Sequence, residues 1–368
     1  MTYNWQLQDW PHFRYDTSVI EDKLYAFAQK AGRISGTAKA LSEPEHAQAL
    51  TTILVNEAIK TSEIEGEFLS RNDVMSSVRR NLGFSVDKRI VKDKRAVGMA
   101  DLMTDVRNSY NDTLNEEKLF YWHQLIFPVA TPINVGTWRS HSEPMQIVSG
   151  AIGREKVHFE APPSKVVPDE ISHFISWYNE TAPKGKNVIK HAPLRSAISH
   201  LYFETIHPFE DGNGRVGRAI AEKALFQSLG HPLLLSLSTT IEANKNAYYD
   251  ALKNGQRSNE ITEWINYFIN MILDALDESE ALIGFILKKT RLFDAYSNQM
   301  NERQLKVINR MLKEGPKGFE GGMTAKKYMS ITQTSKPTAT RDLQKLLEMG
   351  VLIASGGGRS TSYQIQFK

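Results

Sequence analysis

Apolar residues recur every three or four positions along most of the chain, and this spacing predicts a mainly α fold. The second of these runs has Pro44 just inside its start and Gly66 just after its end. Gly32 predicts the end of the first run in the same way. The predicted helical segments cover residues 18–31, 45–64, 92–110, 116–127, 168–180, 191–206, 214–229, 244–254 and 260–288.

One segment, residues 136–161, departs from the helical pattern. Two β-prone runs, MQIV and KVHF, stand on either side of the glycine-containing stretch SGAIGR. Such runs joined by a short glycine-containing stretch are typical of a β-hairpin, which we predict over residues 145–159. Pro162 and Pro163 follow and end the pattern.

The last part of the chain has the pattern of a separate small domain. In residues 301–368, three short amphipathic helical runs precede two strand-like runs around a glycine-rich turn. This order predicts a winged helix-turn-helix. We expect an N-terminal helical region over residues 1–95, a central domain over 96–290 and the small domain over 291–368.

Composition narrows the class of protein. Of the 368 residues, 41% are hydrophobic and 24% are charged, as in an ordinary soluble globular protein. The chain holds no apolar run of the ~18 residues that a membrane span needs, and its first residues lack the pattern of a secretory signal. It has no cysteine, which excludes disulfides, thiolate nucleophiles and cysteine-bound zinc. We therefore expect a cytoplasmic protein with no membrane partner.

Charge is distributed unevenly along the chain. Residues 291–368 carry 13 Lys and Arg against 6 Asp and Glu, a net +7, which leaves −4 for the rest of a chain with net charge +3. A basic excess confined to this small domain favours DNA as its partner. Winged helices also serve as dimerisation or peptide-docking modules, so both interpretations stay open. The residues expected to touch DNA are Thr338, Thr340, Arg341 and Lys345 on or near the recognition helix, and Arg359 in the wing.

Residues 205–218, TIHPFEDGNGRVGR, carry the densest group of reactive side chains. Gly212, Asn213 and Gly214 form a turn that the backbone can make at little steric cost, and a helical pattern starts directly after it. Free N–H groups and the helix dipole at such a point favour an anion. Arg215 and Arg218 lie on one face of that helix, and two guanidinium groups beside an anion site suit a polyphosphate.

Two further side chains complete this candidate site. The carboxylate of Asp211 is an oxygen ligand of the kind that holds the Mg²⁺ accompanying a polyphosphate. His207 stands just upstream and belongs to the residue type best suited to general base catalysis near neutral pH. The pattern therefore predicts proton transfer next to a bound polyphosphate.

The stretch HPFEDGNGRVGR matches every defined position of the signature HxFx(D/E)GNGRxxR, and the chain so resembles the Fic family. The resemblance implies a helical core and transfer of a nucleotide monophosphate, usually AMP from ATP, to a Ser, Thr or Tyr hydroxyl of a target protein. It implies that His207 deprotonates the hydroxyl and that Asp211 binds Mg²⁺. The phosphates would be held by Gly212, Asn213 and Gly214, with Arg215 and Arg218 on the β- and γ-phosphates. Phe209 would anchor the loop.

A second pattern lies at the end of the second helical run. Thr61, Glu65 and Gly66 match (S/T)xxxE(G/N), the inhibitory pattern of the same family, within an inhibitory helix at about residues 45–66. Thr61 and Glu65 are four residues apart and share a helix face. The resemblance implies that Glu65 pairs with Arg218, so that Arg218 is withheld from the γ-phosphate and ATP binds unproductively. Glu63 and Glu67 are out of phase with this pattern.

Two other parts of the chain resemble the family less specifically. The hairpin resembles the family's flap, whose edge strand can align a target protein by backbone hydrogen bonds. The helical run near residue 250 resembles the helix beside the adenosine. The residues carried over are Ile147, Val148, Ser149 and Gly150 for the flap, and Tyr248, Tyr249 and Gln256 for the nucleotide.

The main hypothesis is an autoinhibited protein adenylyltransferase that uses ATP and Mg²⁺ and also modifies itself. A first alternative is the reverse reaction, in which Glu65 aligns a water that removes AMP from a modified protein. A second is a DNA-binding regulator whose Fic domain senses a nucleotide. A homodimer is compatible with each of these.

Overall fold

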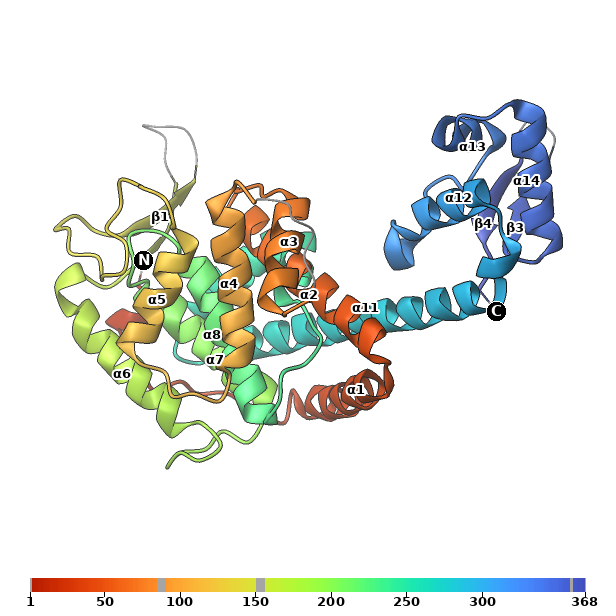
Figure 1. Cartoon of the computed structure of the whole chain (residues 1–368). Coiled ribbons are helices and arrows are strands. Elements are labelled where there is room, and N and C mark those ends of the chain that lie inside the picture. The colour runs from red at the N-terminus through yellow and green to blue at the C-terminus, as the bar shows by residue number, and fades with distance from the viewer. Residues whose placement is uncertain (1, 85–90, 150–155, 358–359, 368) are drawn as a thin grey trace. The chain divides into compact units, whose positions relative to one another are not determined.

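The computed structural model describes residues 2–84, 91–149, 156–357 and 360–367, and it is mainly helical, as predicted (Figure 1). Two helices lie at the centre of the larger compact unit, α7 (Ala192–Ile206) and α8 (Asn213–Leu229), which pack against each other. All of α7 and nearly all of α8 are buried, and the buried residues include charged side chains such as Arg195, Arg218 and Lys223. The helices around this pair are α4 (Lys94–Asn108), α5 (Glu116–Ile126), α6 (Val167–Glu180), α9 (Leu237–Ala243) and α10 (Lys245–Gly255).

The predicted end of the first helix at Gly32 is wrong. Helix α1 spans Glu21–Ala40 and continues through both Gly32 and Gly36. Glycine inside a helix costs ~1 kcal/mol relative to alanine. Both glycines are exposed, while Phe27 and Ile34 are buried before and after Gly32. At ~25 cal/mol per Å² of apolar surface, burying two such side chains outweighs that cost.

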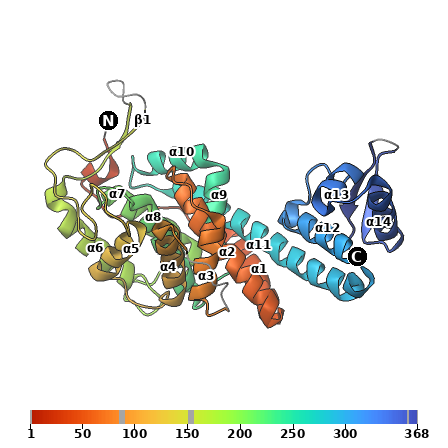
Figure 2. The same cartoon turned by 45° about the horizontal axis from the view of Figure 1, so that its top comes forward.

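Helix α2 (Glu43–Ile64) begins at Glu43 with Pro44 inside its first turn, as expected, and α3 (Arg71–Asn81) follows it. The end of α2 is tied to α9 and α10, which lie beside it in Figure 2. Lys245 of α10 donates to the carbonyl of Ile64, and Lys60 of α2 forms an ion pair with Glu242 of α9 at 3.0 Å. The last turn of α2 is thereby fixed in place.

The predicted hairpin is present. Strands β1 (Gln146–Ser149) and β2 (Lys156–Glu160) pair antiparallel, with Ile147 opposite Phe159. The register shifts directly after Ile147, as at a β-bulge. Tyr3 packs on this end of the hairpin, with its ring 5.0 Å from that of Phe159.

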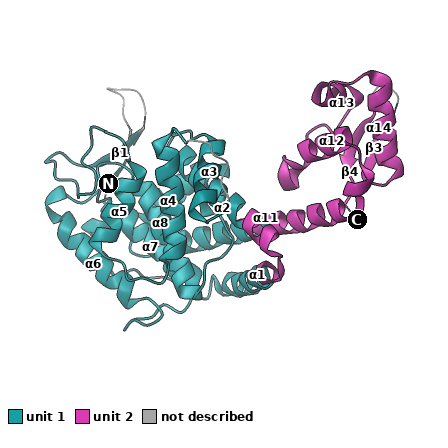
Figure 3. Cartoon of the chain, in the orientation of Figure 1, with its two compact units in different colours: residues 1–36, 50–277 teal, residues 37–49, 278–368 magenta. Residues whose placement is uncertain are grey.

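The chain divides into two compact units, residues 1–36 with 50–277 and residues 37–49 with 278–368 (Figure 3). The first unit takes in most of both the predicted N-terminal region and the predicted central domain, so the boundary near residue 95 stays a prediction. Helix α11 (Thr262–Tyr296), 35 residues long, contributes to both units. In the described ranges we find no helix with the length and apolar content to cross a bilayer.

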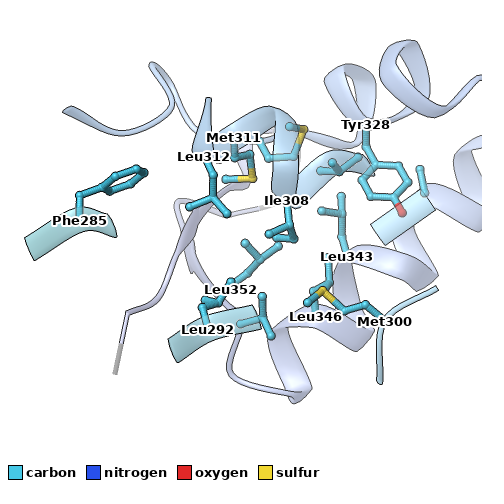
Figure 4. Close-up of a cluster of buried hydrophobic side chains, with 14 residues drawn as sticks. Phe285, Leu292, Met300, Ile308, Met311, Leu312, Tyr328, Leu343, Leu346 and Leu352 are labelled. Carbon is cyan, nitrogen blue, oxygen red and sulfur yellow. The ribbon is translucent and has the colours of Figure 1, made fainter. Parts of the chain in front are cut away.

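The C-terminal part has the predicted order of elements. Its core is formed by side chains such as Ile308, Leu343 and Leu346 (Figure 4). Asp342 joins the helices by accepting hydrogen bonds from Arg303 at 2.8 Å and from the Tyr328 hydroxyl at 2.9 Å. Its identification as a winged helix-turn-helix stays a prediction. The elements are α12 (Glu302–Leu312), α13 (Ala325–Thr332), α14 (Lys336–Glu348), and the antiparallel strands β3 (Leu352–Ser355) and β4 (Ser362–Ile365).

Candidate active site

The candidate site is built on the loop that joins α7 to α8. His207 follows α7 directly with φ 50° and ψ 60°, in the left-handed region that side chains other than glycine rarely occupy. Gly212 occupies the same region, at φ 81°, directly before α8. A Cβ atom at Gly212 would lie 2.8 Å from the ring of Phe127, so both the backbone and the available space require glycine.

The side chain of Asn213 closes this loop on itself. Its oxygen accepts a hydrogen bond from the Phe209 N–H, and its nitrogen donates to the Phe209 carbonyl, both at 2.8 Å. Phe209 is fully buried, and its role as the anchor of the loop stays a prediction. The structure therefore uses the amide of Asn213 to hold the loop, which leaves the phosphate contact expected of this residue to its backbone.

Arg139 fixes the backbone of His207. Its buried guanidinium donates from Nε to the His207 carbonyl at 2.8 Å and from Nη2 to the Pro162 carbonyl at 2.5 Å. Burial lowers the pKa of Arg139 to about 10, so the group keeps its charge at neutral pH. A left-handed non-glycine residue costs ~1–3 kcal/mol, and these bonds hold it in that conformation.

The imidazole of His207 is in the neutral form. Its side chain is 11% exposed. Burial, helped by the charge of Arg139, lowers the pKa of His207 to about 4. A neutral imidazole has a free lone pair, which is what a general base needs. Its Nδ1 atom lies 3.7 Å from the carboxyl group of Glu204, one turn back in α7.

The two acidic residues of the loop have different surroundings. Glu210 accepts from the backbone N–H of Asn134 at 3.1 Å and from its side chain at 2.8 Å. The side chain of Asp211 is 61% exposed and accepts from the Gly212 N–H at 2.5 Å. The described residues contain no cluster of three or more His, Asp or Glu that would form a metal site alone. One exposed carboxylate next to a phosphate site fits Mg²⁺, which shares its remaining positions between phosphate oxygens and water.

Arg218 is held by α2. Its Nε donates to the Thr61 hydroxyl at 2.7 Å, and its Nη2 donates to the Thr61 carbonyl at 2.9 Å and to the Glu65 carboxylate at 2.8 Å. Burial opposes the charge of both partners, yet their attraction lowers the pKa of Glu65 and raises that of Arg218. The structure thus contains the ion pair that the sequence led us to expect.

Arg215 is held by a second carboxylate from the same segment. Its Nη1 lies 3.0 Å from Glu67, and its Nη2 lies 3.9 Å from Asp211. The guanidinium is 1% exposed and lies over the ring of Phe127, with 4.9 Å between its carbon and the ring centroid. Any phosphate that reaches Arg215 must displace Glu67.

Glu67 also reaches the site, although it is out of phase with the inhibitory pattern. Helix α2 ends at Ile64, and Gly66 turns the chain at φ 81°. The N–H of Glu67 donates to the Ser62 carbonyl at 2.9 Å, and that of Gly66 to the Glu63 carbonyl at 3.0 Å. The turn brings Glu67 back to the site that Glu65 reaches from the helix.

The carboxylate of Glu65 lies against the first turn of α8. A Cβ atom at Gly214 would stand 2.3 Å from Glu65 Oε1 and 3.0 Å from Arg218 Nη1. Glu65 therefore sits at the helix N-terminus, where backbone N–H groups and the helix dipole favour an anion. It occupies the place at which the sequence predicts phosphate.

The three residues expected beside the nucleotide fall into two groups. Tyr248 is buried with its hydroxyl 2.7 Å from His200, and Gln256 is buried and donates to the Glu204 carbonyl at 3.1 Å. Their side chains are thus occupied inside the protein. Tyr249 is 39% exposed and leaves part of its ring available for stacking.

The flap residues line one strand of the hairpin. Ile147 packs inward on the cluster around Tyr3, while Val148 is 48% exposed. Ser149 ends β1, and Gly150 lies outside the described residues.

The residues expected to touch DNA lie on α14. Thr340, Arg341 and Lys345 are exposed, and Thr338 is partly exposed. Arg359 lies outside the described residues.

Residues outside the signature complete the loop, and sequence reasoning missed them. His123 stacks on Phe209 with ring centroids 4.0 Å apart. Its Nδ1 accepts from the Gly136 N–H at 2.9 Å, so the proton is on Nε2, which donates to the Asp211 carbonyl at 3.0 Å. No spacing rule links His123 to Asp211, 88 residues away, or Arg139 to His207, 68 residues away.

Comparison with known proteins agrees with this geometry. The model described as the Fic/DOC family matches residues 113–225, and a domain of unknown function, DUF4172, matches residues 3–84. A Fido domain-containing protein of Dictyostelium discoideum, DDB_G0283145, is 33% identical over 116 residues, which are 30% of this chain and 75% of that protein. The chain belongs to the Fic/DOC family.

Other members of the Fic/DOC family match over a smaller share of their length. A probable protein adenylyltransferase of Aquifex aeolicus, aq_aa38, is 30% identical over 34% of this chain and 40% of its own. Protein adenylyltransferase fic-1 of Caenorhabditis elegans is 23% identical over 52% of this chain and 34% of its own. The chain thus spans less than half the length of these two relatives.

The fold is also that of solved structures in the family. A Fic family protein from Desulfovibrio desulfuricans G20 superposes with a TM-score of 0.57 at 20% identity, over 97% of this chain and 98% of that one. A Fic domain containing signaling protein from Bacteroides thetaiotaomicron VPI-5482 gives a TM-score of 0.52 at 18% identity, over 70% of this chain and 96% of that one. The expected mainly α Fic fold is confirmed.

Proposed function

We propose that this chain is a protein adenylyltransferase that transfers AMP from ATP to a Ser, Thr or Tyr hydroxyl of a target protein and of itself. The observation that carries the proposal is the loop between α7 and α8. It holds a buried neutral histidine next to a helix N-terminus with two buried arginines on its first turns. The names of the relatives from Aquifex aeolicus and Caenorhabditis elegans support the same activity.

In this mechanism each group of the site has one task. The N–H groups at the start of α8 and the guanidiniums of Arg215 and Arg218 bind the β- and γ-phosphates. His207 takes the proton of the target hydroxyl as its oxygen attacks the α-phosphorus, and pyrophosphate leaves. Asp211 would hold Mg²⁺, which supplies positive charge to offset that of the phosphates. Positioning and charge stabilisation account for most of the rate enhancement.

We further propose that the described structure is an inhibited state. Glu65 occupies the anion site at α8 and takes up Arg218, and Glu67 takes up Arg215. ATP must compete with both carboxylates, so bound ATP lacks the contacts that align its α-phosphorus.

The test is the intact mass of purified protein after incubation with Mg²⁺ and ATP. Glu65→Gly should gain the mass of one or more AMP groups, wild type should gain little, and Glu65→Gly combined with His207→Ala should gain none. Separate incubations with GTP, CTP and UTP give the nucleotide preference. An unmodified Glu65→Gly variant with all four nucleotides would refute the proposed transfer.

DNA binding by the C-terminal domain is a second candidate function. It is favoured by the helix, helix, helix, hairpin order of residues 302–365, by the net +7 of residues 291–368 and by the exposed Arg341 and Lys345. The full chain should shift a DNA duplex with an affinity that falls steeply with salt. Arg341→Ala with Lys345→Ala should weaken that shift. No shift near physiological salt would refute this function.

A further inference from the structure

We propose that Glu204 is a positioning residue for His207, because its carboxyl group fixes the imidazole tautomer and stabilises the charge that the ring gains during transfer. This inference rests on the function proposed above, since it concerns the same base. Glu204 lies three residues before the signature begins, and nothing in the signature refers to it.

The geometry places two buried polar groups opposite each other. Glu204 is 3% exposed, and its Oε2 lies 3.7 Å from Nδ1 of His207. Among the described residues, neither that Nδ1 nor the Oε1 of Glu204 meets hydrogen-bond geometry with a partner, although the backbone carbonyl of Glu204 also faces the imidazole. Buried polar atoms without a partner are rare in native proteins. A movement of ~1 Å would join this pair by a hydrogen bond of ordinary length.

The site of this carboxyl group is built by its neighbours. A Cβ atom at Gly217, inside α8, would stand 2.2 Å from Glu204 Oε1, so only glycine leaves room for the carboxyl. Gln256 donates to the Glu204 carbonyl at 3.1 Å and accepts from the Asn4 N–H at 2.9 Å. Glycine inside a helix costs ~1 kcal/mol, and here it makes space for one carboxyl group.

The chemistry requires a partner at this position. His207 can take the hydroxyl proton on Nε2 only if the resting proton is on Nδ1. An acceptor next to Nδ1 fixes that tautomer, and a negative charge there stabilises the imidazolium that forms. The hydroxyl proton ends on Nε2, the hydroxyl oxygen bonds to the α-phosphorus, and pyrophosphate leaves with the electron pair of the broken P–O bond. Glu204 takes up no proton in this step.

Charges around the pair link it to the inhibitory segment. Glu204 faces Arg218 on α8 and Glu65 from α2, and it also faces the phenol groups of Tyr248 and Tyr249 on α10. His207 faces Arg139 and Glu65. Burial raises the pKa of Glu204 to about 8, which Arg218 opposes and Glu65 increases. Withdrawal of Glu65 therefore lowers the pKa of Glu204 and favours the ionised carboxyl that would stabilise the imidazolium.

The test compares Glu204→Gln with its parent in the Glu65→Gly background. The nitrogen chemical shifts of the His207 imidazole, assigned with His207→Ala, report the tautomer without any turnover. Self-modification at several ATP concentrations and pH values reports kcat and KM. Glu170→Gln is the control, because this acid on α6 binds the Trp10 indole at 2.9 Å and does not touch His207.

We expect Glu204→Gln to shift the tautomer population and to lower kcat about 10- to 100-fold, a part of the ~10²–10⁴-fold that general base catalysis contributes. KM for ATP should stay within about twofold, since Glu204 touches no phosphate site. The parent should lose rate as pH falls through the pKa of Glu204, below about 8, and the Gln variant should lack that limb. Glu204→Asp should recover part of kcat.

Three outcomes decide the inference. A kcat within twofold of the parent overturns it, whatever the tautomer. If Glu65→Gly transfers no AMP at all, the proposed function fails. The role of Glu204 is then judged from the tautomer alone, and an unchanged tautomer of His207 in Glu204→Gln overturns it. If Glu204→Gln does not fold, Gly217→Ala takes its place, because its added Cβ displaces the carboxyl without removing it and should lower kcat in the same way.

Discussion

Two carboxylates, Glu65 and Glu67, stand where the phosphates of ATP are proposed to bind, and this predicts how tightly variants bind ATP. Glu65→Gln removes the charge that faces Arg218, and Glu67→Gln removes the charge that faces Arg215. Both changes keep the size of the side chain. In each variant ATP competes with one carboxylate fewer, so its dissociation constant should fall.

The contacts give the size of each effect. Glu65 accepts a hydrogen bond at 2.8 Å from a buried guanidinium, and such charged hydrogen bonds contribute ~1.5–3 kcal/mol. Because its side chain is 28% exposed, we take the lower end, which corresponds to about 10- to 30-fold tighter binding. In the described part of the chain, Arg215 Nη1 lies 3.0 Å from Glu67 without hydrogen-bond geometry. An ion pair of this kind contributes ~0.5–1 kcal/mol, or about two- to fivefold.

The assay is isothermal titration calorimetry of ATP, with and without Mg²⁺, in the His207→Ala background to prevent turnover. Glu63→Gln is the matched control. Glu63 lies on the same helix and forms an ion pair with Lys60 at 2.6 Å. Its replacement should leave the dissociation constant within about twofold.

Equal ATP affinity in wild type and Glu65→Gln would refute the reasoning, and so would a Glu63→Gln effect as large as that of Glu65→Gln. The double variant Glu65→Gln with Glu67→Gln should bind ATP more tightly than either single variant, because each removes a different competitor for one ligand.

Other predictions follow from single contacts. Gly214→Ala should lower self-modification in the Glu65→Gly background, measured by intact mass, because the new Cβ would stand 2.3 Å from the position that Glu65 Oε1 now holds, which is the place proposed for phosphate. Thr61→Val should raise activity less than Glu65→Gly does, since it removes one of the three hydrogen bonds that Arg218 donates to α2 and leaves the Glu65 carboxylate in place. Arg139→Met should lower the melting temperature and abolish transfer, because the carbonyls of His207 and Pro162 lose a buried charged donor worth ~1.5–3 kcal/mol each. Asp342 is buried, which raises its pKa, but hydrogen bonds from Arg303, Tyr328 and Asn301 outweigh this and lower the pKa below its ordinary value. The ionised Asp342 carboxylate therefore contributes fully to stability above pH ~4, and this contribution is lost as pH falls through the folded-state pKa. Acid unfolding monitored by tyrosine fluorescence should start at a higher pH in Asp342→Asn than in the wild type.

The sequence was most informative where function depends on consecutive residues. The segment from His207 to Arg218 could be assigned to a turn before a helix because its glycines and helical spacing are local properties. The pairing of Glu65 with Arg218 could be expected only through the family resemblance. The contact of Glu67 with Arg215 could not be expected from helix spacing, since the chain turns at Gly66 and the spacing rule ends there.

Residues that act at a distance gave no signal in the sequence. Arg139 reaches His207 because segments far apart in the chain pack together, and packing of this kind has no fixed spacing. Glu204 is only three residues before His207, but nothing in the sequence showed that its carboxyl group would be buried beside the imidazole. Gly32 failed as a helix stop for a related reason. The burial of Phe27 and Ile34 in α1 outweighs a local preference of ~1 kcal/mol.

The contact of Glu65 with Arg218 joins residues 153 positions apart within one chain. A blocking group on the same polypeptide is present at a fixed local concentration, so the blocked fraction does not depend on how much protein is present. Dilution cannot release it, in contrast to inhibition by a separate subunit. If the contact blocks the site as proposed, the active fraction of molecules depends on whatever displaces the last turn of α2. Synthesis of more protein leaves the ratio of blocked to open molecules unchanged.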